Sequence, residues 1–208
     1  MTQISESGLS FSFLDNVDVK KFDDTKFYRS YYNNLPNCKG VDIIANSDKI
    51  LQIIEVKNCI GYETENMWRT SVNNSKLSSA PAGLNVDERD SLDIEVSKKV
   101  ASTISCLFGA WTKSSQVDVA EELSIFWENA CSKKIPAMQK SIHVVLFLEG
   151  NFNNPYSRTR NKKMIMKRLQ DSISDKLSWL NCRVFVVVPS RFMRKFICRL
   201  RLNEVSRQ

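Results

Sequence analysis

The chain has 208 residues, of which 42% are hydrophobic and 25% charged, and its formal net charge is +7. This length suits one folded domain with a sizeable core, and the composition is ordinary for a globular protein. No apolar run approaches the ~18 residues of a membrane helix, and the N-terminus lacks the basic and apolar regions of a signal peptide. We therefore expect a cytoplasmic protein with no membrane partner.

The cysteines and the histidine argue against a zinc site and for reduced thiols. The six cysteines are scattered and none forms a C-x-x-C pair, and the only histidine is His143, to which we assign no role. Zinc sites in proteins are built from clustered cysteine and histidine side chains. A zinc site is therefore disfavoured, and we expect reduced thiols.

The N-terminal part of the chain predicts a strand and a helix. Phe11 and Phe13 alternate as in an edge strand, and residues 1–18 are expected to form an N-terminal arm. Aromatic pairs at four-residue spacing predict a helix from about Val19 to Asn33.

Two short apolar runs follow, at Val41–Ala45 and Ile50–Lys57, and the polar residues 46–49 separate them. β-branched residues dominate both runs and the polar residues are turn formers, so the pattern predicts a β-hairpin. A loop of two or four residues centred on Ser47 and Asp48 would place Ala45 opposite Ile50.

Three charged residues interrupt these apolar strands, at Asp42, Glu55 and Lys57. In the predicted register Asp42 and Glu55 are diagonal neighbours, with backbones roughly 7–8 Å apart, and Lys57 lies further along the same face. Two carboxylates at that spacing can hold one divalent cation. The alternative is an ordinary ion pair at the strand end, and a three-residue loop would turn Asp42 to the other face.

The rest of the chain alternates between helix and strand patterns. The helices have apolar residues three and four apart, and the strands are continuous apolar runs typical of central strands in a sheet covered on both faces. The expected elements are, in order, a flexible loop (63–86), a helix (86–113), a second helix (119–131), a strand (142–148), a helix (162–180), a strand (183–189) and a basic helix (190–208). These elements predict an α/β fold with a mixed central sheet flanked by helices and a helical C-terminal extension.

Asp42, twelve intervening residues and then Glu55-Val56-Lys57 resemble the D-x(n)-E-x-K signature of the PD-(D/E)XK nuclease superfamily, although Val41 replaces its proline. The order of elements is also similar to the αββ(β)αβ restriction-endonuclease-like core. The resemblance implies that Asp42, Glu55 and the carbonyl of Val56 hold Mg²⁺, with Mn²⁺ as a substitute. It further implies that Lys57 orients or activates the attacking water.

The same resemblance implies two further contributions to the site from helices. The first core helix of the family often gives an acidic ligand, for which Asp23 and Asp24 are the local candidates. The helix after the E-x-K strand can present a basic residue, here Lys98 or Lys99. The alternatives are acidic residues that favour a helix start and lysines exposed on a helix surface.

The net charge is concentrated in the C-terminal third, where residues 151–208 contain 14 Lys and Arg against 3 Asp and Glu. Such a basic segment favours nucleic acid as a partner, DNA before RNA, over a solvated basic surface or a membrane-facing helix. The candidate contacts are Arg158, Arg160, Lys162, Lys163, Arg191, Arg194, Lys195 and Arg199.

These features together predict a metal-dependent nuclease that hydrolyses phosphodiester bonds of nucleic acid. The alternative is a catalytically inactive nucleic-acid-binding or interaction subunit, in which Asp42, Glu55 and Lys57 form a structural ion pair. A homodimer and a larger defence or processing complex both remain open as assemblies. The chain has no glycine-rich phosphate loop, so an ATPase is disfavoured.

Overall fold

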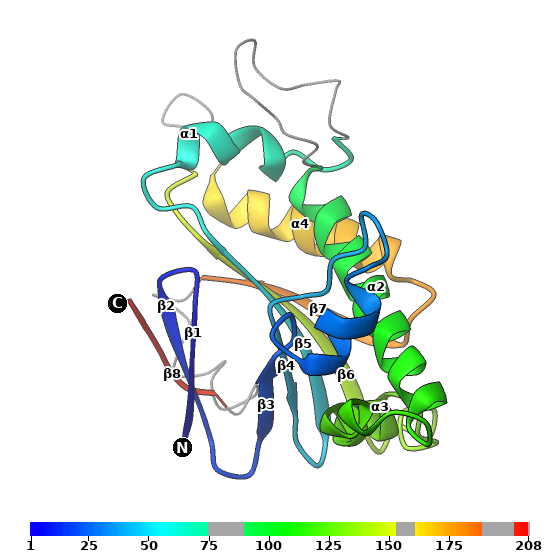
Figure 1. Cartoon of the computed structure of the whole chain (residues 1–208). Coiled ribbons are helices and arrows are strands. Elements are labelled where there is room, and N and C mark those ends of the chain that lie inside the picture. The colour runs from blue at the N-terminus through cyan, green and yellow to red at the C-terminus, as the bar shows by residue number, and fades with distance from the viewer. Residues whose placement is uncertain (75–89, 153–160, 189–201, 208) are drawn as a thin grey trace.

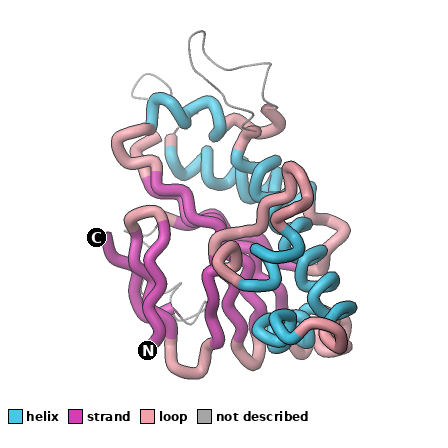
Figure 2. The backbone as a smooth tube through the Cα atoms, viewed as in Figure 1, coloured by secondary structure: helices cyan, strands magenta, loops and turns pink. Residues whose placement is uncertain are grey.

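The structure, a computed structural model, describes residues 1–74, 90–152, 161–188 and 202–207. These residues form three layers (Figure 1), because helices cover one face of a five-stranded sheet and a small three-stranded sheet covers the other. Figure 2 shows the helices gathered on one side of the strands. The predicted α/β fold with a mixed sheet flanked by helices is confirmed. Within the described ranges, no helix has both the length and the apolar character needed to cross a bilayer.

The five-stranded sheet has the strand order β3-β4-β5-β6-β7. Its strands are Asp18–Lys21, Ile43–Asn46, Ile50–Asn58, Ser141–Glu149 and Cys182–Val187. The pairs from β3 to β5 are antiparallel, whereas those from β5 to β7 are parallel. The predicted hairpin and the predicted strand at 142–148 are confirmed. The strand predicted at 183–189 is present as β7, but it is the last strand of this sheet rather than a central one.

Helices connect the successive parallel strands, because a parallel strand pair needs a long crossover connection. Helix α2 (Leu92–Lys113) leads from β5 towards β6, and α4 (Lys162–Lys176) connects β6 to β7. Between α2 and β6 lie a 3₁₀ helix, η3 (Asp118–Leu123), and α3 (Ser124–Ala130). The helices predicted at 86–113 and 162–180 are therefore confirmed within the described residues, with shorter bounds, whereas the one predicted at 119–131 is a 3₁₀ helix followed by a short α-helix.

Residues 63–74, expected to belong to a flexible loop, contain two short helices. These are α1 (Glu63–Asn66) and a 3₁₀ helix, η2 (Met67–Thr70). Residues 75–86 of the predicted loop lie outside the described residues.

The N-terminal residues form a packed hairpin and not an arm. Strands β1 (Thr2–Glu6) and β2 (Leu9–Phe13) pair with each other, and β2 also pairs with β8 (Leu202–Arg207). Phe11 and Phe13 are fully buried, and the ring of Phe11 contacts that of Phe147 in β6. The apolar side chains of this hairpin are therefore part of the core.

Strand β8 contradicts the predicted C-terminal helix over residues 202–207. Leu202 and Val205 are three residues apart, a spacing that suits a helix, but the open edge of β2 recruits this segment as a strand. Residues 190–201 and 208, the remainder of the predicted helix, lie outside the described residues, as does residue 189 of the strand predicted at 183–189.

The helix predicted over 19–33 is wrong in its first half. Strand β3 pairs with the edge of β4, and only a single π-helical turn, η1 (Tyr28–Tyr32), follows. The aromatic pairs at four-residue spacing do contact each other along this turn, with the rings of Phe27 and Tyr31 stacked 5.2 Å apart. The aromatic spacing therefore predicted the helical turn correctly. The residues before it form a strand instead, because they pair with β4.

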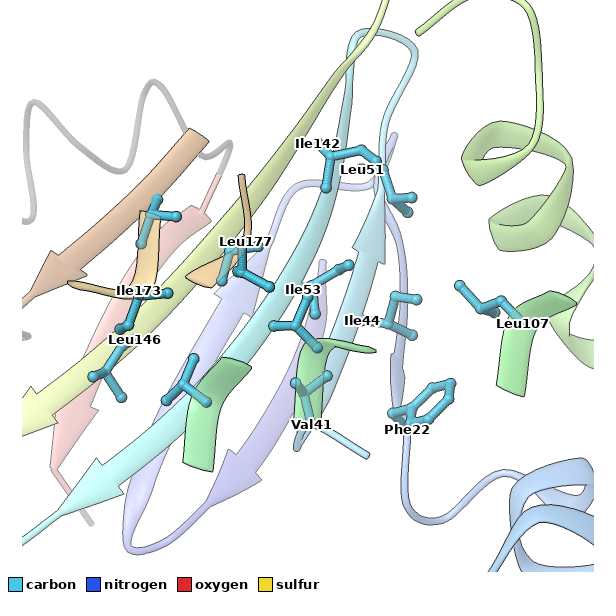
Figure 3. Close-up of a cluster of buried hydrophobic side chains, with 14 of the residues drawn as sticks. Phe22, Val41, Ile44, Leu51, Ile53, Leu107, Ile142, Leu146, Ile173 and Leu177 are labelled. Carbon is cyan, nitrogen blue, oxygen red and sulfur yellow. The ribbon is translucent and has the colours of Figure 1, made fainter. Parts of the chain in front are cut away.

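The core consists of two apolar clusters on opposite faces of the five-stranded sheet. Figure 3 shows the cluster on the helix side, where Ile44, Ile53 and Leu146 of the sheet face Leu107 of α2 and Ile173 of α4. The second cluster joins the other face of the sheet to β1 and β2. Alternate side chains of β5 therefore enter one core or the other.

Gly40, two residues before Asp42, provides a test of this packing. A Cβ atom at Gly40 would lie 2.5 Å from Cδ1 of Phe22 and 3.3 Å from Cε2 of Tyr28. We expect Gly40→Ala to lower the free energy of unfolding by about 1–3 kcal/mol, as overpacked cores do. Urea denaturation measures this change.

The matched control is Gly109→Ala in α2, where an added Cβ has no neighbour within 4 Å. This substitution should raise stability by roughly 0.5–1 kcal/mol, because alanine favours a helix interior over glycine. Equal effects of the two substitutions would contradict the packing described around Gly40.

Candidate functional site

The register of the β4–β5 hairpin places the charged residues. The backbone N–H of Ser47 donates to the carbonyl of Ile50 at 2.9 Å, which closes the turn one residue later than expected. Ala45 consequently pairs with Gln52 and not with Ile50, so the predicted register was wrong by two residues. A shift of two residues keeps every side chain on its original face.

Asp42 lies closer to Glu55 than the diagonal arrangement predicted. The last ladder pair is Ile43 with Ile54, and one residue further Asp42 comes level with Glu55. Oδ2 of Asp42 accepts a hydrogen bond from the backbone N–H of Val56 at 2.7 Å, which holds the carboxylate against β5. The structure therefore brings together the two carboxylates predicted as metal ligands.

The Glu55 side chain is fully buried on the helix-facing side of β5. Its Oε1 accepts from Nζ of Lys99 at 2.5 Å and lies 2.7 Å from Nζ of Lys57. Its Oε2 has no hydrogen-bond partner among the described residues. Burial raises the pKa of Glu55, although the charges of Lys57 and Lys99 oppose the rise. One oxygen of a buried carboxylate is thus left to accept a further ligand.

Lys57 lies between two carboxylates, with Nζ 2.7 Å from Oε1 of Glu55 and 2.9 Å from Oε1 of Glu95. Burial alone would lower the pKa of Lys57, but these two carboxylates raise it above its ordinary value. Lys57 therefore carries a proton at neutral pH. In this arrangement it donates hydrogen bonds and does not accept a proton.

Of the two lysines considered on α2, Lys99 enters the site. Its Nζ lies 3.5 Å from Oδ1 of Asp42 in addition to its contact with Glu55, and only 13% of its side chain is exposed. Lys98 is exposed over 65% of its side chain and pairs with Asp90. The alternative of an exposed helix lysine is therefore correct for Lys98 and wrong for Lys99.

Glu95 and Arg69 complete the site, and sequence reasoning missed both. Oε2 of Glu95 pairs with the Arg69 guanidinium, which also donates to Oδ1 of Asn66 at 3.1 Å. Glu95 precedes Lys99 by four residues and so shares its helix face, a signal that the sequence does contain. Arg69 lies in a stretch predicted as flexible loop, where no pattern relates it to the hairpin.

These contacts form one continuous group, which we call the ion-pair chain. It has three carboxylates and three cations in alternation, and so no net charge. Its members, in order, are Asp42, Lys99, Glu55, Lys57, Glu95 and Arg69.

Of the two acidic residues in the predicted first helix, Asp23 lies near Asp42 of the site. Asp24 pairs with Arg29. Asp23 follows Phe22, whose N–H donates to the Asp42 carbonyl at 2.8 Å. Partial desolvation raises the pKa of Asp23, although the residue is exposed, and the charges of Asp24 and Asp42 add to the rise. A role for Asp23 or Asp24 as a further ligand stays a prediction.

Only two of the predicted nucleic-acid contacts fall within the described residues, and both begin α4. Nζ of Lys162 donates to the carbonyl of Gly150 at 2.6 Å, and Lys163 is exposed. Strands β6 and β7 are adjacent and parallel, so the segments that follow them leave the sheet at the same edge. The candidates outside the described residues are Arg158, Arg160, Arg191, Arg194, Lys195 and Arg199.

Comparison with known families classifies the chain without assigning an activity. A family model described as a family of unknown function, DUF6661, matches residues 25–200. The chain belongs to this family. The match includes the β4–β5 hairpin, α2 and every member of the ion-pair chain. No curated protein and no solved structure matches the chain. Any function assigned to this DUF6661 member must therefore be argued from its own site.

The ion-pair chain predicts how stability depends on pH. Burial would raise the pKa of Glu95, but Lys57 and Arg69 lower it below its ordinary value. A carboxylate with a lowered folded-state pKa stabilises the fold above the unfolded-state pKa, about 4.3, and this contribution is lost as pH falls further. We expect Glu95→Gln to cost about 1–3 kcal/mol at pH 7 and progressively less below pH ~4.

Urea denaturation of Glu95→Gln and the native chain across this pH range measures the difference. The control is Glu65→Gln, at an exposed glutamate of α1, which should change stability little at any pH. A cost for Glu95→Gln that does not vary with pH would contradict the ion pairing of Glu95.

Proposed function

We propose that this protein is a metal-dependent nuclease of the PD-(D/E)XK type that hydrolyses phosphodiester bonds of nucleic acid. One observation carries the proposal: a fully buried Glu55 lies level with Asp42, and one of its oxygens has no partner among the described residues. Lys57 occupies the same face of the same strand. This is the arrangement of side chains that the D-x(n)-E-x-K resemblance implies.

The residues present fit a hard divalent cation. Mg²⁺ prefers carboxylate and carbonyl oxygens, which Asp42, Glu55 and the backbone of Val56 offer. The Lys99 ammonium lies between the two carboxylates, 2.5 Å from Glu55 and 3.5 Å from Asp42, and so stands in for a cation there. We propose Mg²⁺ as the resident ion and Mn²⁺ as its substitute.

Each residue then has a defined part in the reaction. The bound ion supplies charge neutralisation at the scissile phosphate and a water of lowered pKa. Lys57, protonated between Glu55 and Glu95, donates hydrogen bonds that orient the attacking water or stabilise charge on the phosphate. Glu95, held by Arg69, keeps the Lys57 ammonium in place.

We propose DNA before RNA as the substrate and the cytoplasm as the compartment. The basic C-terminal third supports a polyanionic partner, and the exposed Lys163 at the start of α4 is a described member of that segment. Such contacts position a phosphate backbone without reading bases. The five described cysteines, Cys38, Cys59, Cys106, Cys131 and Cys182, are free thiols, which suits a reducing compartment.

One observation favours a second candidate, a catalytically inactive nucleic-acid-binding or interaction subunit. The ion-pair chain balances its own charges without any added ion. A structural cluster needs no further partner to remain stable. The two candidates differ in one property, cleavage of nucleic acid that depends on a divalent cation.

The two carboxylates give the first test of activity. We expect the native chain to cleave nucleic acid in Mg²⁺ or Mn²⁺, and Asp42→Asn or Glu55→Gln to lose roughly 100-fold or more of the rate. The cause is the loss of a negatively charged ligand at nearly unchanged side-chain volume. The assay uses single- and double-stranded DNA and RNA, with circular dichroism as the check on folding.

Glu65→Gln on α1 is the matched control and should keep the native rate. Full activity in a folded Asp42→Asn or Glu55→Gln variant would overturn the assignment. Absence of cleavage by the native chain on all four substrates would favour the inactive subunit.

Lys57→Met separates chemistry from ion binding. Since Lys57 is placed to donate hydrogen bonds and not to ligate, we expect this variant to keep Mn²⁺ binding and nucleic-acid affinity but to lose cleavage. Isothermal titration calorimetry with Mn²⁺ measures the first property. If the affinity for Mn²⁺ falls as far as in Glu55→Gln, then Lys57 organises the ion site and has no separate chemical role.

A further inference from the structure

We propose that Lys99 is a built-in competitor for the divalent cation: its ammonium occupies the cation position between Asp42 and Glu55 and must leave before the ion binds. This inference rests on the proposed function, because it concerns the same pair of carboxylates. It adds a residue from α2 that controls the affinity for the ion.

The contacts distinguish Lys99 from the other cations of the ion-pair chain. Its Nζ reaches both carboxylates, at 2.5 Å from Oε1 of Glu55 and 3.5 Å from Oδ1 of Asp42. Lys57 contacts the same Oε1 of Glu55 but bridges it to Glu95, and not to Asp42. Lys99 is therefore the ammonium at the place where a divalent ion would bridge the two strands.

Charge balance explains why the ion and Lys99 exclude each other. The ion-pair chain has no net charge, so a divalent ion added beside Lys99 would leave two uncompensated positive charges in a largely buried group. Like charges a few ångströms apart repel strongly where water is scarce. If the Lys99 ammonium withdraws, the ion brings a net gain of only one positive charge.

Lys99 is not sealed from solvent in the site. Its side chain is 13% exposed, so part of it already reaches water. A lysine can swing its ammonium to water while its aliphatic stem stays packed. Asp42 remains fixed meanwhile by its hydrogen bond from the N–H of Val56. The carboxylates are thus held in place while the competitor moves.

Metal affinity is consequently set by exchange of one cation for another. The protein keeps its fold without the ion, because Lys99 already compensates Glu55 and Asp42. The cost of displacing Lys99 weakens ion binding. Removing the Lys99 charge should tighten it.

The experiment compares Lys99→Met with Lys98→Met, its exposed neighbour on α2, by calorimetric titration of the full chain with Mn²⁺ in the absence of nucleic acid. We expect Lys99→Met to bind Mn²⁺ roughly tenfold more tightly than the native chain, or more. Lys98→Met should bind Mn²⁺ as the native chain does. Without the ion, Lys99→Met should have a lower Tm, and Mn²⁺ should raise its Tm more than that of the native chain.

The outcomes separate this inference from the proposed function. If the native chain binds Mn²⁺ and Glu55→Gln does not, but Lys99→Met binds equally or more weakly, the competitor role is overturned and the ion site stands. If neither the native chain nor Lys99→Met binds Mn²⁺, both fail. Should Lys99→Met not fold, Lys99→Gln keeps a hydrogen-bond donor without the charge, and the same tighter binding is expected.

Discussion

The burial of one carboxyl side chain, that of Glu55, constrains the arrangement of the elements around it. It lies in β5, whose two faces are covered by the helices and by the small sheet. An isolated carboxylate in such a place costs several kcal/mol, so the neighbouring elements must supply cations. Lys57 comes from the same strand and Lys99 from α2. The placement of α2 on the sheet is therefore tied to a charge on β5.

Helix α2 is held at its first turn by a second buried carboxylate, that of Asp93. Its oxygens accept from the hydroxyls of Ser91 at 2.6 Å and Ser172 at 2.8 Å, and Lys176 of α4 lies 2.8 Å away. Burial would raise the pKa of Asp93, but Lys176 and these hydrogen bonds lower it, so the group stays ionised. Asp93 fixes α2 to α4, while Lys99 fixes α2 to β5. A shift of the helix along its axis would break both attachments.

The elements that were predicted correctly are those whose own residues carry a clear helix or strand pattern. The apolar run of β6 and the three- and four-residue spacing in α2 and α4 need no knowledge of a partner. Strands β3 and β8 are different, because each is short and forms on the edge of a strand distant in the sequence. The register of the hairpin differed by two residues because the turn is centred on Asp48 and Lys49, one residue later than expected. Side-chain alternation nevertheless kept Asp42 and Glu55 on one face.

The same distinction separates the parts of the candidate site. Asp42, Glu55 and Lys57 were predictable because they are charges within apolar strands of one hairpin. Glu95 was predictable in principle, since it lies one helical turn before Lys99, a candidate site residue, and shares its helix face. Arg69 was not, because its partner Glu95 is 26 residues away and no helix or strand periodicity relates the two.

The energetics of buried ions favour a functional account of the ion-pair chain over a purely structural one. Replacing a buried ion pair by well-packed apolar residues is often neutral or stabilising, so stability alone gives no reason to keep charges in a sheet interior. A cluster selected for structure would also be expected to satisfy its polar atoms, because an orphaned buried acceptor is costly. Glu55 Oε2 has no partner among the described residues, although its neighbours are charged. Both features follow if the carboxylates are kept for a divalent ion, since the Lys99 ammonium occupies only Oε1 of Glu55 and leaves Oε2 open to a further ligand.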